Sequence, residues 1–525
     1  MAAAARQRGI GEAMGKNDED CVNFKAAGFD ASRARAGLDA LWRGPARDAL
    51  VEYVAIPSRS PAFDRGWAES GHIERAVCLA ERFAREYLPP GASVEVLRHP
   101  GRTPLLVLEI AQRLSSGEVV VETASAEASA RVIQAAKSTE PTVLLYGHLD
   151  KQPEMSGWGE GLGAWTPVLR DDRLYGRGGA DDGYSVFAII AALRALAEQG
   201  TPHARCLALI ECSEESGSPD LPAWVETLAD RLGAVELVIA LDSGCGDYER
   251  LWTTTSLRGI AMGNLEVEVL KEGVHSGDAS GIVPSSFRLV RRLLDRIEDS
   301  ATGAIRLSIL NPEIPALRIE QARRVAEILG TAVWDHFPWA GETRPIDADP
   351  ATCVLARTWR PALSIIAAEG LPTPDNAGNV LRPKTVLGLS MRTPPTVDAE
   401  AVIAQMREVL ETDPPQGATI RFRGHGQQGW HAPEEADWLA AALEVASHEW
   451  FGRPTAAMGE GGTIPFMGML GERFPQAQFV ITGVLGPGSN AHGPNEFLHL
   501  PTAERLSGCV ARLLASHPQA LRASR

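Results

Sequence analysis

Short apolar segments alternate with segments of helical periodicity through the first half of this chain. The strand-like segments are residues 93–97, 105–110, 143–146, 206–210 and 237–241. Apolar residues recur at helical spacing over 45–56, 67–87, 185–200 and 221–232. Strands that alternate with helices in this way form a parallel or mixed sheet with helices on both faces. The sequence therefore predicts an α/β fold built on a mixed, largely parallel sheet.

The pattern changes after residue 258, and the change predicts a second domain. Alternating apolar residues over 265–269 and 386–391 indicate strands, and a helix is expected between them at 285–297. A later helix at 434–450 returns to the pattern of the first half. We therefore expect an α+β domain inserted into a discontinuous α/β domain. The expected division is a disordered tail at 1–30, two segments of the discontinuous domain at 31–257 and 425–525, and the inserted domain at 258–424.

Composition excludes several classes of protein. The chain has 525 residues, and 51 Lys and Arg against 67 Asp and Glu give a formal net charge of −16. Without a basic run, neither nucleic acid nor an anionic membrane is an expected partner. No apolar stretch reaches the roughly 20 residues that span a bilayer, and the N-terminal residues do not resemble a signal peptide. The Ala-, Ser- and Glu-rich stretch 115–141 is expected to be a surface excursion.

Cysteine usage bears on the compartment and on the type of metal site. Seven cysteines are scattered along the chain without CxxC spacing. Such a pattern indicates neither a disulfide framework nor a thiolate zinc site. A reducing cytoplasm fits this pattern best.

Polar side chains follow the apolar strands at five places. Each place could hold only an ordinary loop residue, a helix cap or a solvated acidic pair. Parallel α/β sheets, however, place their ligands at the carboxyl ends of the strands, and all five places lie at such ends. These residues are His148 with Asp150, Asp181 with Asp182, Glu214 with Glu215, Asp242, and His492.

The residue types at these strand ends indicate a metal centre. Two imidazoles and several carboxylates, without thiolate, suit a pair of divalent ions such as Zn or Mn. Asp150, two residues after His148, can orient the imidazole of a metal ligand. Glu214 and Glu215 point in different directions, so one can bind a metal while the other faces the attacking water.

Six motifs in this order resemble a known enzyme family. They are GHLDKQP, YGRGGADDG, EESGS, VHSGDASG, GEGGTIP and NAHGPNE. The chain resembles the aminoacylase/carboxypeptidase-type dinuclear metallopeptidases, in particular the carnosine and cysteinylglycine dipeptidase branch. The resemblance covers about residues 38–514. It implies that the discontinuous domain is the catalytic domain and that the inserted domain is a lid or dimerisation domain. Three departures are Gly183-Tyr184 in place of a common Lys-Gly, the AHGPNE ending, and the length of 115–141.

The resemblance implies a role for each candidate metal-site residue. His148 and Asp242 are expected to hold one metal ion, Glu215 and His492 the other, and Asp181 to bridge them. Asp150 is expected to orient His148, and Glu214 to be the general base. The Asp181–Asp182 peptide bond is expected to be cis.

The resemblance also implies substrate contacts outside the metal site. His275 is expected to stabilise the oxyanion from the inserted domain of a partner subunit, so the active form is a homodimer. Arg392 is expected to clamp the substrate carboxylate, because its planar guanidinium matches that group. The other expected substrate-lining residues are His425, Gly462, Thr463 and Asn379.

The function predicted from these residues is metal-dependent hydrolysis of dipeptides or small peptides with a free carboxylate. Two divalent ions, zinc first with manganese or cobalt as alternatives, activate a water from which Glu214 takes a proton. One alternative is an N-acyl-amino-acid amidohydrolase, which would use the same metals and Arg392. Another is a catalytically dead relative that acts as a binding module, against which the intact Glu214 and five candidate ligands argue.

Overall fold

The structure, a computed structural model, describes residues 29–113 and 141–523. The chain divides into two compact units. Unit 1 comprises Met1–Thr253, Pro433–Thr455 and Gln476–Arg525, and unit 2 comprises Thr254–Ala432 and Ala456–Pro475. The chain therefore leaves unit 1 for unit 2 and returns twice, at 254–432 and again at 456–475. The predicted tail and the surface excursion at 115–141 fall almost entirely outside the described residues.

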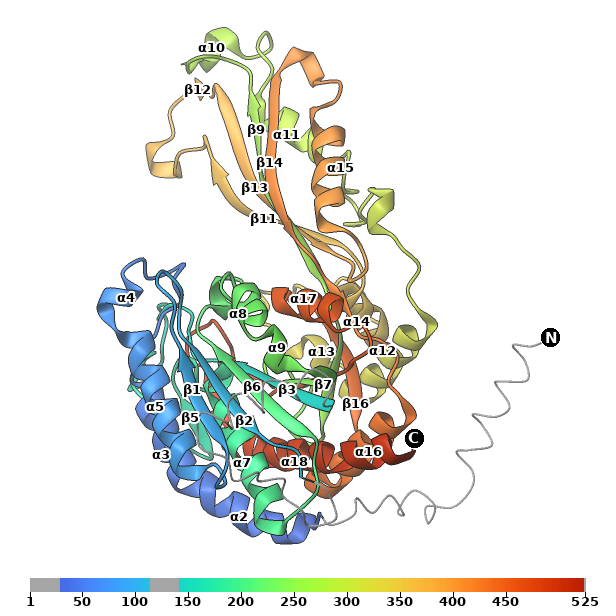
Figure 1. The fold of residues 1–525 in the computed structure, drawn as a ribbon. Helices are drawn as coiled ribbons and strands as arrows, with labels where there is room; N and C mark the ends of the chain where they lie inside the picture. Colours follow the sequence, from blue (N-terminus) through green and yellow to red (C-terminus); the bar gives the residue numbers. More distant parts are fainter. Residues whose placement is uncertain (1–28, 114–140, 524–525) are drawn as a thin grey trace, which may run out of the picture. The chain divides into compact units, whose positions relative to one another are not determined.

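Unit 1 is built on a six-stranded mixed sheet (Figure 1). Strands β6, β3, β7 and β17 run parallel to one another, whereas β2 pairs antiparallel with both β6 and the edge strand β1. In spatial order the strands are β1 (Ser93–Leu97), β2 (Leu105–Ile110), β6 (Arg205–Glu211), β3 (Pro141–His148), β7 (Ala234–Ala240) and β17 (Gln478–Ile481). The predicted largely parallel α/β fold is confirmed.

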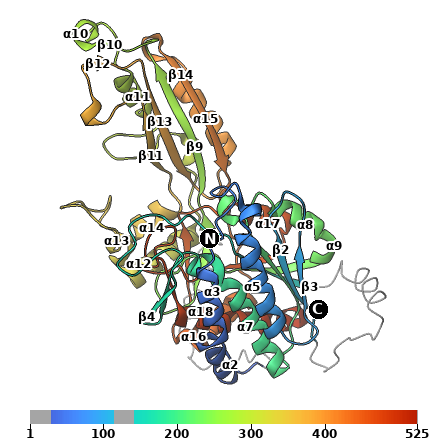
Figure 2. The same ribbon diagram turned by 90° about the vertical axis from the view of Figure 1, so that its left-hand side faces the viewer.

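Helices cover this sheet because its strands are apolar on both faces. Every residue of β6 is buried, and so is all of β3 after Pro141. Helix α7 (Tyr184–Gln199) is apolar nearly all round and packs between β3, α5 (His72–Tyr87) and α18 (Leu500–Ala523). The neighbouring helices α5 and α7 can be followed in Figures 1 and 2. These contacts hold the start of α7 next to the C-terminal end of β3.

Other helices complete the layers of unit 1. Helix α3 ends two residues before the range that periodicity predicts, and the helix expected over 67–87 is broken at Gly71, which has a φ of 67°. The helix expected over 221–232 is divided at Leu228, and the one expected over 434–450 begins three residues later. The bounds are α2 (Ala31–Arg43), α3 (Pro45–Val54), α4 (Trp67–Ser70), α8 (Leu221–Thr227), α9 (Ala229–Leu232) and α16 (Asp437–Phe451).

Unit 2 contains a four-stranded antiparallel sheet with two helices packed on one face (Figure 1). Its strand order is β11 (Ala362–Glu369), β13 (Lys384–Thr393), β9 (Gly259–Glu268) and β14 (Thr419–Gln427). Helices α11 (Ser286–Leu294) and α15 (Ala399–Glu411) bury their apolar faces against residues such as Leu265, Leu389 and Phe422. Unit 2 also holds a short sheet of β15 (Trp430–His431), β8 (Trp252–Leu257) and β16 (Ala456–Glu460), with α12 (Ala316–Leu329) and α14 (Pro350–Thr358).

Among the described residues, no helix combines the length and the apolar character needed to cross a membrane. The six cysteines that the structure describes are all free thiols.

A buried histidine in α18 makes the fold sensitive to acid. His517 is 2% exposed, and although a carboxylate oxygen of Glu236 lies 3.6 Å from its Nε2, burial lowers its pKa to about 4. Unfolded histidine titrates near 6.5, so below that pH the unfolded chain binds more protons than the folded chain. The stability that neutral His517 supports is therefore complete above pH 6.5 and lost as the pH falls toward 4.

We expect this histidine to remove about 2 kcal/mol from the free energy of unfolding between pH 7 and pH 5. Urea denaturation of wild type and His517→Leu at both pH values measures the effect, and the variant should lose correspondingly less stability. His99→Leu, at an exposed position, is the matched control. Equal pH dependence of wild type and His517→Leu would contradict the assignment.

Candidate metal centre

One cluster of potential metal ligands joins the ends of β3 and β7 to the segment after β6. His148 is the last residue of β3, Asp242 follows β7, and Glu214 begins a short 3₁₀ turn after β6. One ligand atom from each of these side chains lies within 4.8 Å of the others. Three parallel strands that end at the same sheet edge bring these residues together, as the sequence pattern predicts.

A second cluster lies beside the first. Asp181, Glu215 and His492 each offer a ligand atom within 4.8 Å of the others. His492 Nε2 is 2.9 Å from Asp181 Oδ2 and 3.4 Å from Glu215 Oε2. The adjacent residues Glu214 and Glu215 therefore serve different clusters, as their expected directions imply.

Asp181 stands between the two clusters. One of its carboxylate oxygens, Oδ1, is 3.5 Å from Nε2 of His148, and the other is the oxygen that faces His492. His148 Nε2 is in turn 3.9 Å from Asp242 Oδ2. A carboxylate with one oxygen directed to each cluster has the geometry of a bridging ligand.

The backbone turn that contains Asp181 lies very close to the end of β3. The Asp181–Asp182 peptide bond is cis, which confirms the expectation from the resemblance. Asp182 Oδ2 accepts a hydrogen bond from the backbone N–H of His148 at 3.1 Å, so the glycine-rich turn is tied to the end of β3. At Gly147 a Cβ atom would lie 2.1 Å from Ser185 Oγ, so only glycine allows this approach. The turn before α7 is thus docked on the strand that carries His148.

Asp150 holds other residues of the site in place. Its two carboxylate oxygens accept the backbone N–H groups of Glu214 at 3.1 Å and Glu215 at 3.0 Å. His148 Nδ1 lies 3.1 Å from the Asp150 carbonyl oxygen and 3.5 Å from its Oδ1. Asp150 therefore contacts His148 as predicted, and it also positions both glutamates, a role that sequence reasoning did not include.

The chemistry of the donor set fits divalent cations. His148 Nε2 is buried and has no hydrogen-bond partner among the described residues, although it faces two carboxylates. Burial, and next the negative charge of Asp242, raise the pKa of Glu214 well above its usual value. Burial and the neighbouring Asp181 likewise raise the pKa of Glu215 to about 8. Positive charge at this place would offset the repulsion among these carboxylates.

The carboxylates of the site also change the pKa of His492. Burial lowers the pKa of its imidazole, but the hydrogen bond to Asp181 and the charges of Asp181 and Glu215 outweigh burial and raise it to about 9. The backbone of His492 has a φ of 63°, which is uncommon for a residue other than glycine. Its loop thus presents the imidazole to two carboxylates from an unusual backbone conformation, a feature that is frequent at functional sites.

Sequence reasoning missed a buried ion pair that ties two loops of this site together. Arg177 Nη1 contacts Glu496 Oε2 at 2.5 Å, and both side chains are almost fully buried. Arg177 also donates to the carbonyl oxygen of Gly493, and Glu496 accepts the N–H of Gly178. The pair therefore joins the turn before Asp181 to the loop that carries His492. Both residues lie within the YGRGG and NAHGPNE motifs, so their membership of these motifs was the available signal.

We expect Arg177→Met to lower the free energy of unfolding by about 3–5 kcal/mol, because it leaves Glu496 buried without its partner. Urea denaturation measures this loss. The control is Arg82→Met, whose ion pair with Glu52 is 2.7 Å long but has side chains 62% and 55% exposed. That substitution should cost less than about 1 kcal/mol. Similar losses for the two variants would contradict the role given to Arg177.

The predicted substrate residues all lie in unit 2, in two groups. Arg392, near the end of β13, donates from Nη1 to Thr463 Oγ1 at 3.2 Å, and Gly462 precedes that threonine. His425 lies on β14 opposite Met262 of β9, two positions along β9 from Ile260, which pairs with Arg392. The sheet thus brings Arg392, Thr463 and His425 into one region of unit 2.

The second group contains His275 and Asn379. His275 ends the two-residue strand β10 (Val274–His275), which pairs with β12 (Val380–Leu381). The carbonyl oxygen of Asn379 accepts the N–H of Ser276 at 2.9 Å, and both His275 and Asn379 are exposed. The structure therefore places these two residues side by side at the surface of unit 2.

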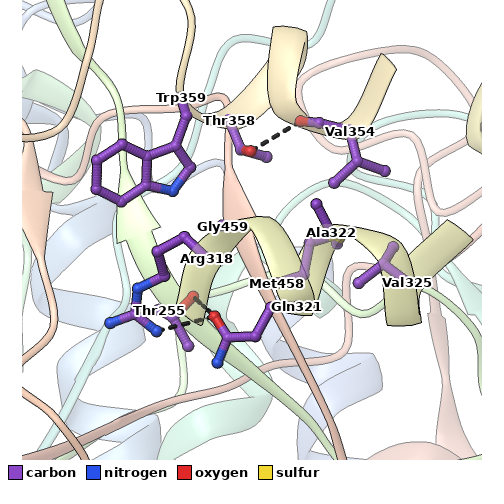
Figure 3. Close-up of a pocket in the computed structure, with 10 residues that line it drawn as sticks. All are labelled: Thr255, Arg318, Gln321, Ala322, Val325, Val354, Thr358, Trp359, Met458 and Gly459. Atoms are coloured by element: carbon purple, nitrogen blue, oxygen red, sulfur yellow. Dashed lines mark hydrogen bonds between the residues drawn. The ribbon is translucent and has the colours of Figure 1, made fainter. Parts of the chain in front are cut away.

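Unit 2 also contains a small cavity, shown in Figure 3. Its volume is about 10 Å³, room for a water molecule at most. Arg318 at its wall donates to Gln321 Oε1 at 2.9 Å and to His431 Nε2 at 3.0 Å. This cavity is too small for a peptide and belongs to the packing of α12 against α14.

Comparison with known proteins places the chain in a class that fits this site. Residues 144–516 match the model of peptidase family M20/M25/M40. The cysteinylglycine-S-conjugate dipeptidase of Corynebacterium striatum is 27% identical over 394 residues, which cover 69% of this chain and 80% of that protein. Human Beta-Ala-His dipeptidase is 27% identical over 344 residues, covering 64% of this chain and 66% of that protein.

Solved structures with the same fold extend over nearly the whole chain. Dug1p from Saccharomyces cerevisiae, described as a di-peptidase, has a TM-score of 0.69 at 20% identity and covers 93% of this chain and 99% of its own. Human carnosine dipeptidase 1 has a TM-score of 0.67 at 21% identity and covers 93% of this chain and 100% of its own. Fold and site together define a metal-dependent peptidase. The chain belongs to peptidase family M20/M25/M40.

Proposed function

We propose that the protein hydrolyses the amide bond of dipeptides or small peptides that carry a free carboxylate, with two divalent metal ions. The observation that carries this proposal is the pair of ligand clusters with Asp181 between them. The relatives that act on cysteinylglycine conjugates and on Beta-Ala-His support the substrate class.

The residues proposed to hold the metal ions are those of the two clusters. His148 and Asp242 would hold one ion, Glu215 and His492 the other, and Asp181 both. Nitrogen and carboxylate donors without thiolate favour zinc, with manganese or cobalt as alternatives. Bound ions of this kind polarise an amide carbonyl and lower the pKa of a water molecule.

Glu214 is the proposed general base. Its carboxylate lies beside His148 and Asp242, at the position from which it can accept a proton from the attacking water. The same group then returns the proton to the amine that leaves. Asp150 holds Glu214 in this position through the N–H of Glu214, while it also contacts His148.

Arg392 is the proposed clamp for the substrate carboxylate. Within the described parts of the chain, its one hydrogen bond to another side chain runs from Nη1 to Thr463 Oγ1 and leaves most of the five guanidinium N–H donors available. Thr463, Gly462, His425 and Asn379 are proposed to line the rest of the substrate site. His275 is proposed to stabilise the oxyanion when it is supplied by a partner subunit.

A homodimer through the inserted domain, proposed to span 258–424, is supported by the edge of the four-stranded sheet. The edge strand β11 leaves its outer hydrogen-bonding side unpaired within the described sheet, and its Ile365 and Ile366 are 47% and 61% exposed. A second copy that pairs there would cover these apolar residues. Sedimentation analysis should give a dimer for wild type and a monomer for Ile366→Lys, and a monomeric wild type would contradict the proposal.

The free thiols support a reducing compartment such as the cytoplasm.

The proposed activity is tested with the full chain loaded with Zn, Mn or Co and a panel of dipeptides, tripeptides and N-acetyl amino acids. Cleavage of free dipeptides supports the proposal. Cleavage of acylated amino acids alone would instead favour an N-acyl-amino-acid amidohydrolase, which the same metal site and Arg392 could serve. Absence of any amide cleavage with all three metals would overturn the enzyme assignment and favour a binding module.

A further inference from the structure

Three arginines gather around one short segment of unit 2. The segment, residues 458–463, contains the end of β16 and the glycine-rich loop that follows it. Arg392 donates to Thr463 Oγ1, and the same hydroxyl donates to the carbonyl oxygen of Arg258 at 2.6 Å. Arg357, on α14, donates from Nη2 to Met458 Sδ at 3.1 Å. Arg258 lies between strands β8 and β9, Arg392 on β13 and Arg357 on α14, and all three side chains lie around this segment.

Gly461 lies between two of these side chains. A Cβ atom at Gly461 would lie 3.1 Å from Arg258 Nη2 and 3.3 Å from Arg357 Cγ. Arg258 is 8% exposed, and its guanidinium donates to the carbonyl oxygens of Gly461, Ala356 and Arg360. Burial, and next the positive charges of Arg392 and Arg357, lower the pKa of Arg258 to about 10. The positive charges of the two neighbouring arginines thus disfavour the charged form of Arg258.

Among the residues that the structure describes, no carboxylate contacts this cluster directly. Within the part of the chain that the structure describes, none of the three guanidinium groups forms an ion pair. Glu460 is near enough to act on Arg357 through its charge, but one carboxylate cannot offset three cations. Among the described residues, Arg357 and Arg392 each make one side-chain hydrogen bond, to a thioether sulfur and a hydroxyl, neither of which carries charge. Two planar guanidinium groups therefore keep N–H donors that no described side chain accepts.

We propose that Arg357, with the buried charge of Arg258 behind it, binds a second carboxylate beside the one that Arg392 clamps. The enzyme would then prefer peptides whose C-terminal residue is glutamate or aspartate. This inference rests on the proposed function, because it assumes that Arg392 holds the C-terminal carboxylate of a peptide. Arg357 supplies the N–H donors for the acidic side chain, and Arg258, whose Nε and Nη1 donate to carbonyl oxygens, supplies positive potential.

Charge selectivity follows from this arrangement. Hydrogen bonds between a guanidinium and a carboxylate are stronger than those to a neutral amide, and a partly buried cation without an anion gains most from such a bond. Glutamine has nearly the shape of glutamate but lacks its charge. The pair Ala-Glu and Ala-Gln therefore isolates the contribution of the second carboxylate.

The test compares kcat/KM for Ala-Glu and Ala-Gln with the metal-loaded full chain. Wild type should prefer Ala-Glu by about tenfold or more, chiefly through KM. Arg357→Gln should bring the ratio close to one by lowering kcat/KM for Ala-Glu about tenfold, whereas Arg357→Lys should retain part of the preference. The matched control is Arg324→Gln, the same charge change at an exposed position on α12.

Binding of free glutamate and glutamine, measured by calorimetry, supplies a readout that does not require hydrolysis. Wild type should bind glutamate about tenfold more tightly than glutamine, and Arg357→Gln should remove the difference while thermal unfolding shows that the variant is folded. If no peptide is cleaved but this binding pattern holds, the proposed hydrolase fails and the anion site stands. Equal binding of the two amino acids by wild type, or an Arg357→Gln variant with unchanged preference, overturns the inference.

Discussion

Replacing Glu214 with glutamine is expected to lower kcat by about 10²- to 10⁴-fold while two metal ions per chain remain bound. The amide of glutamine keeps the size of the side chain but cannot accept the proton of the attacking water. Steady-state kinetics with a dipeptide gives the loss in kcat, and elemental analysis of the purified variant gives the metal content. KM should change little, since Glu214 acts on the water rather than on the substrate carboxylate.

The same variant separates two roles for Glu214, because its carboxylate also lies within ligand distance of His148 and Asp242. A general base removed by Glu214→Gln leaves metal binding intact, whereas a ligand removed by it lowers the metal content. Loss of metal together with activity would contradict the general-base assignment. Glu69→Gln, at an exposed position on α4, is the matched control and should leave both kcat and metal content unchanged.

Replacing Asp181 with alanine is expected to abolish turnover and to remove both metal ions, because this carboxylate is the one that faces both clusters. Ligands that bind only the folded state stabilise it, by about 2.7 kcal/mol for one site when the free ligand is at one hundred times Kd. Chelation should therefore lower the Tm of wild type. The Tm of Asp181→Ala should not respond to chelation, because no metal is left to remove.

Differential scanning fluorimetry with and without chelator measures this difference. Asp230→Ala, at an exposed position on α9, should behave as wild type. Full metal content in Asp181→Ala would contradict the bridging role. Retention of one ion would instead place Asp181 in a single cluster.

Local sequence was sufficient to predict the elements that build the metal site. The apolar runs that precede His148, Glu214 and Asp242 are strands, as periodicity predicts, because a buried parallel strand must be apolar on both faces. The strand expected over 143–146 extends to Pro141–His148, so His148 ends the strand rather than following it. Local patterns predict such ends poorly, because a residue at the end of a strand can serve the site and need not follow the apolar pattern of the buried strand.

Sequence spacing could not predict which residues meet across the fold. Arg177 and Glu496 are separated by 319 positions, yet they form one buried ion pair. The three arginines of unit 2, at positions 258, 357 and 392, carry no common motif, and only the packing of α14 and β13 around residues 458–463 brings them together.

By itself, then, the sequence determined the class of fold and, through its resemblance to a family, the candidate metal ligands and the cis peptide. Only the tertiary structure showed that Glu214 lies with His148 and Asp242, and that Asp150 accepts the N–H groups of both glutamates. The physical reason is that strand type follows from local periodicity, whereas neighbours across a sheet follow from strand order. Here β3 lies between β6 and β7, and that order, set by packing of the whole sheet, brings these side chains to one edge.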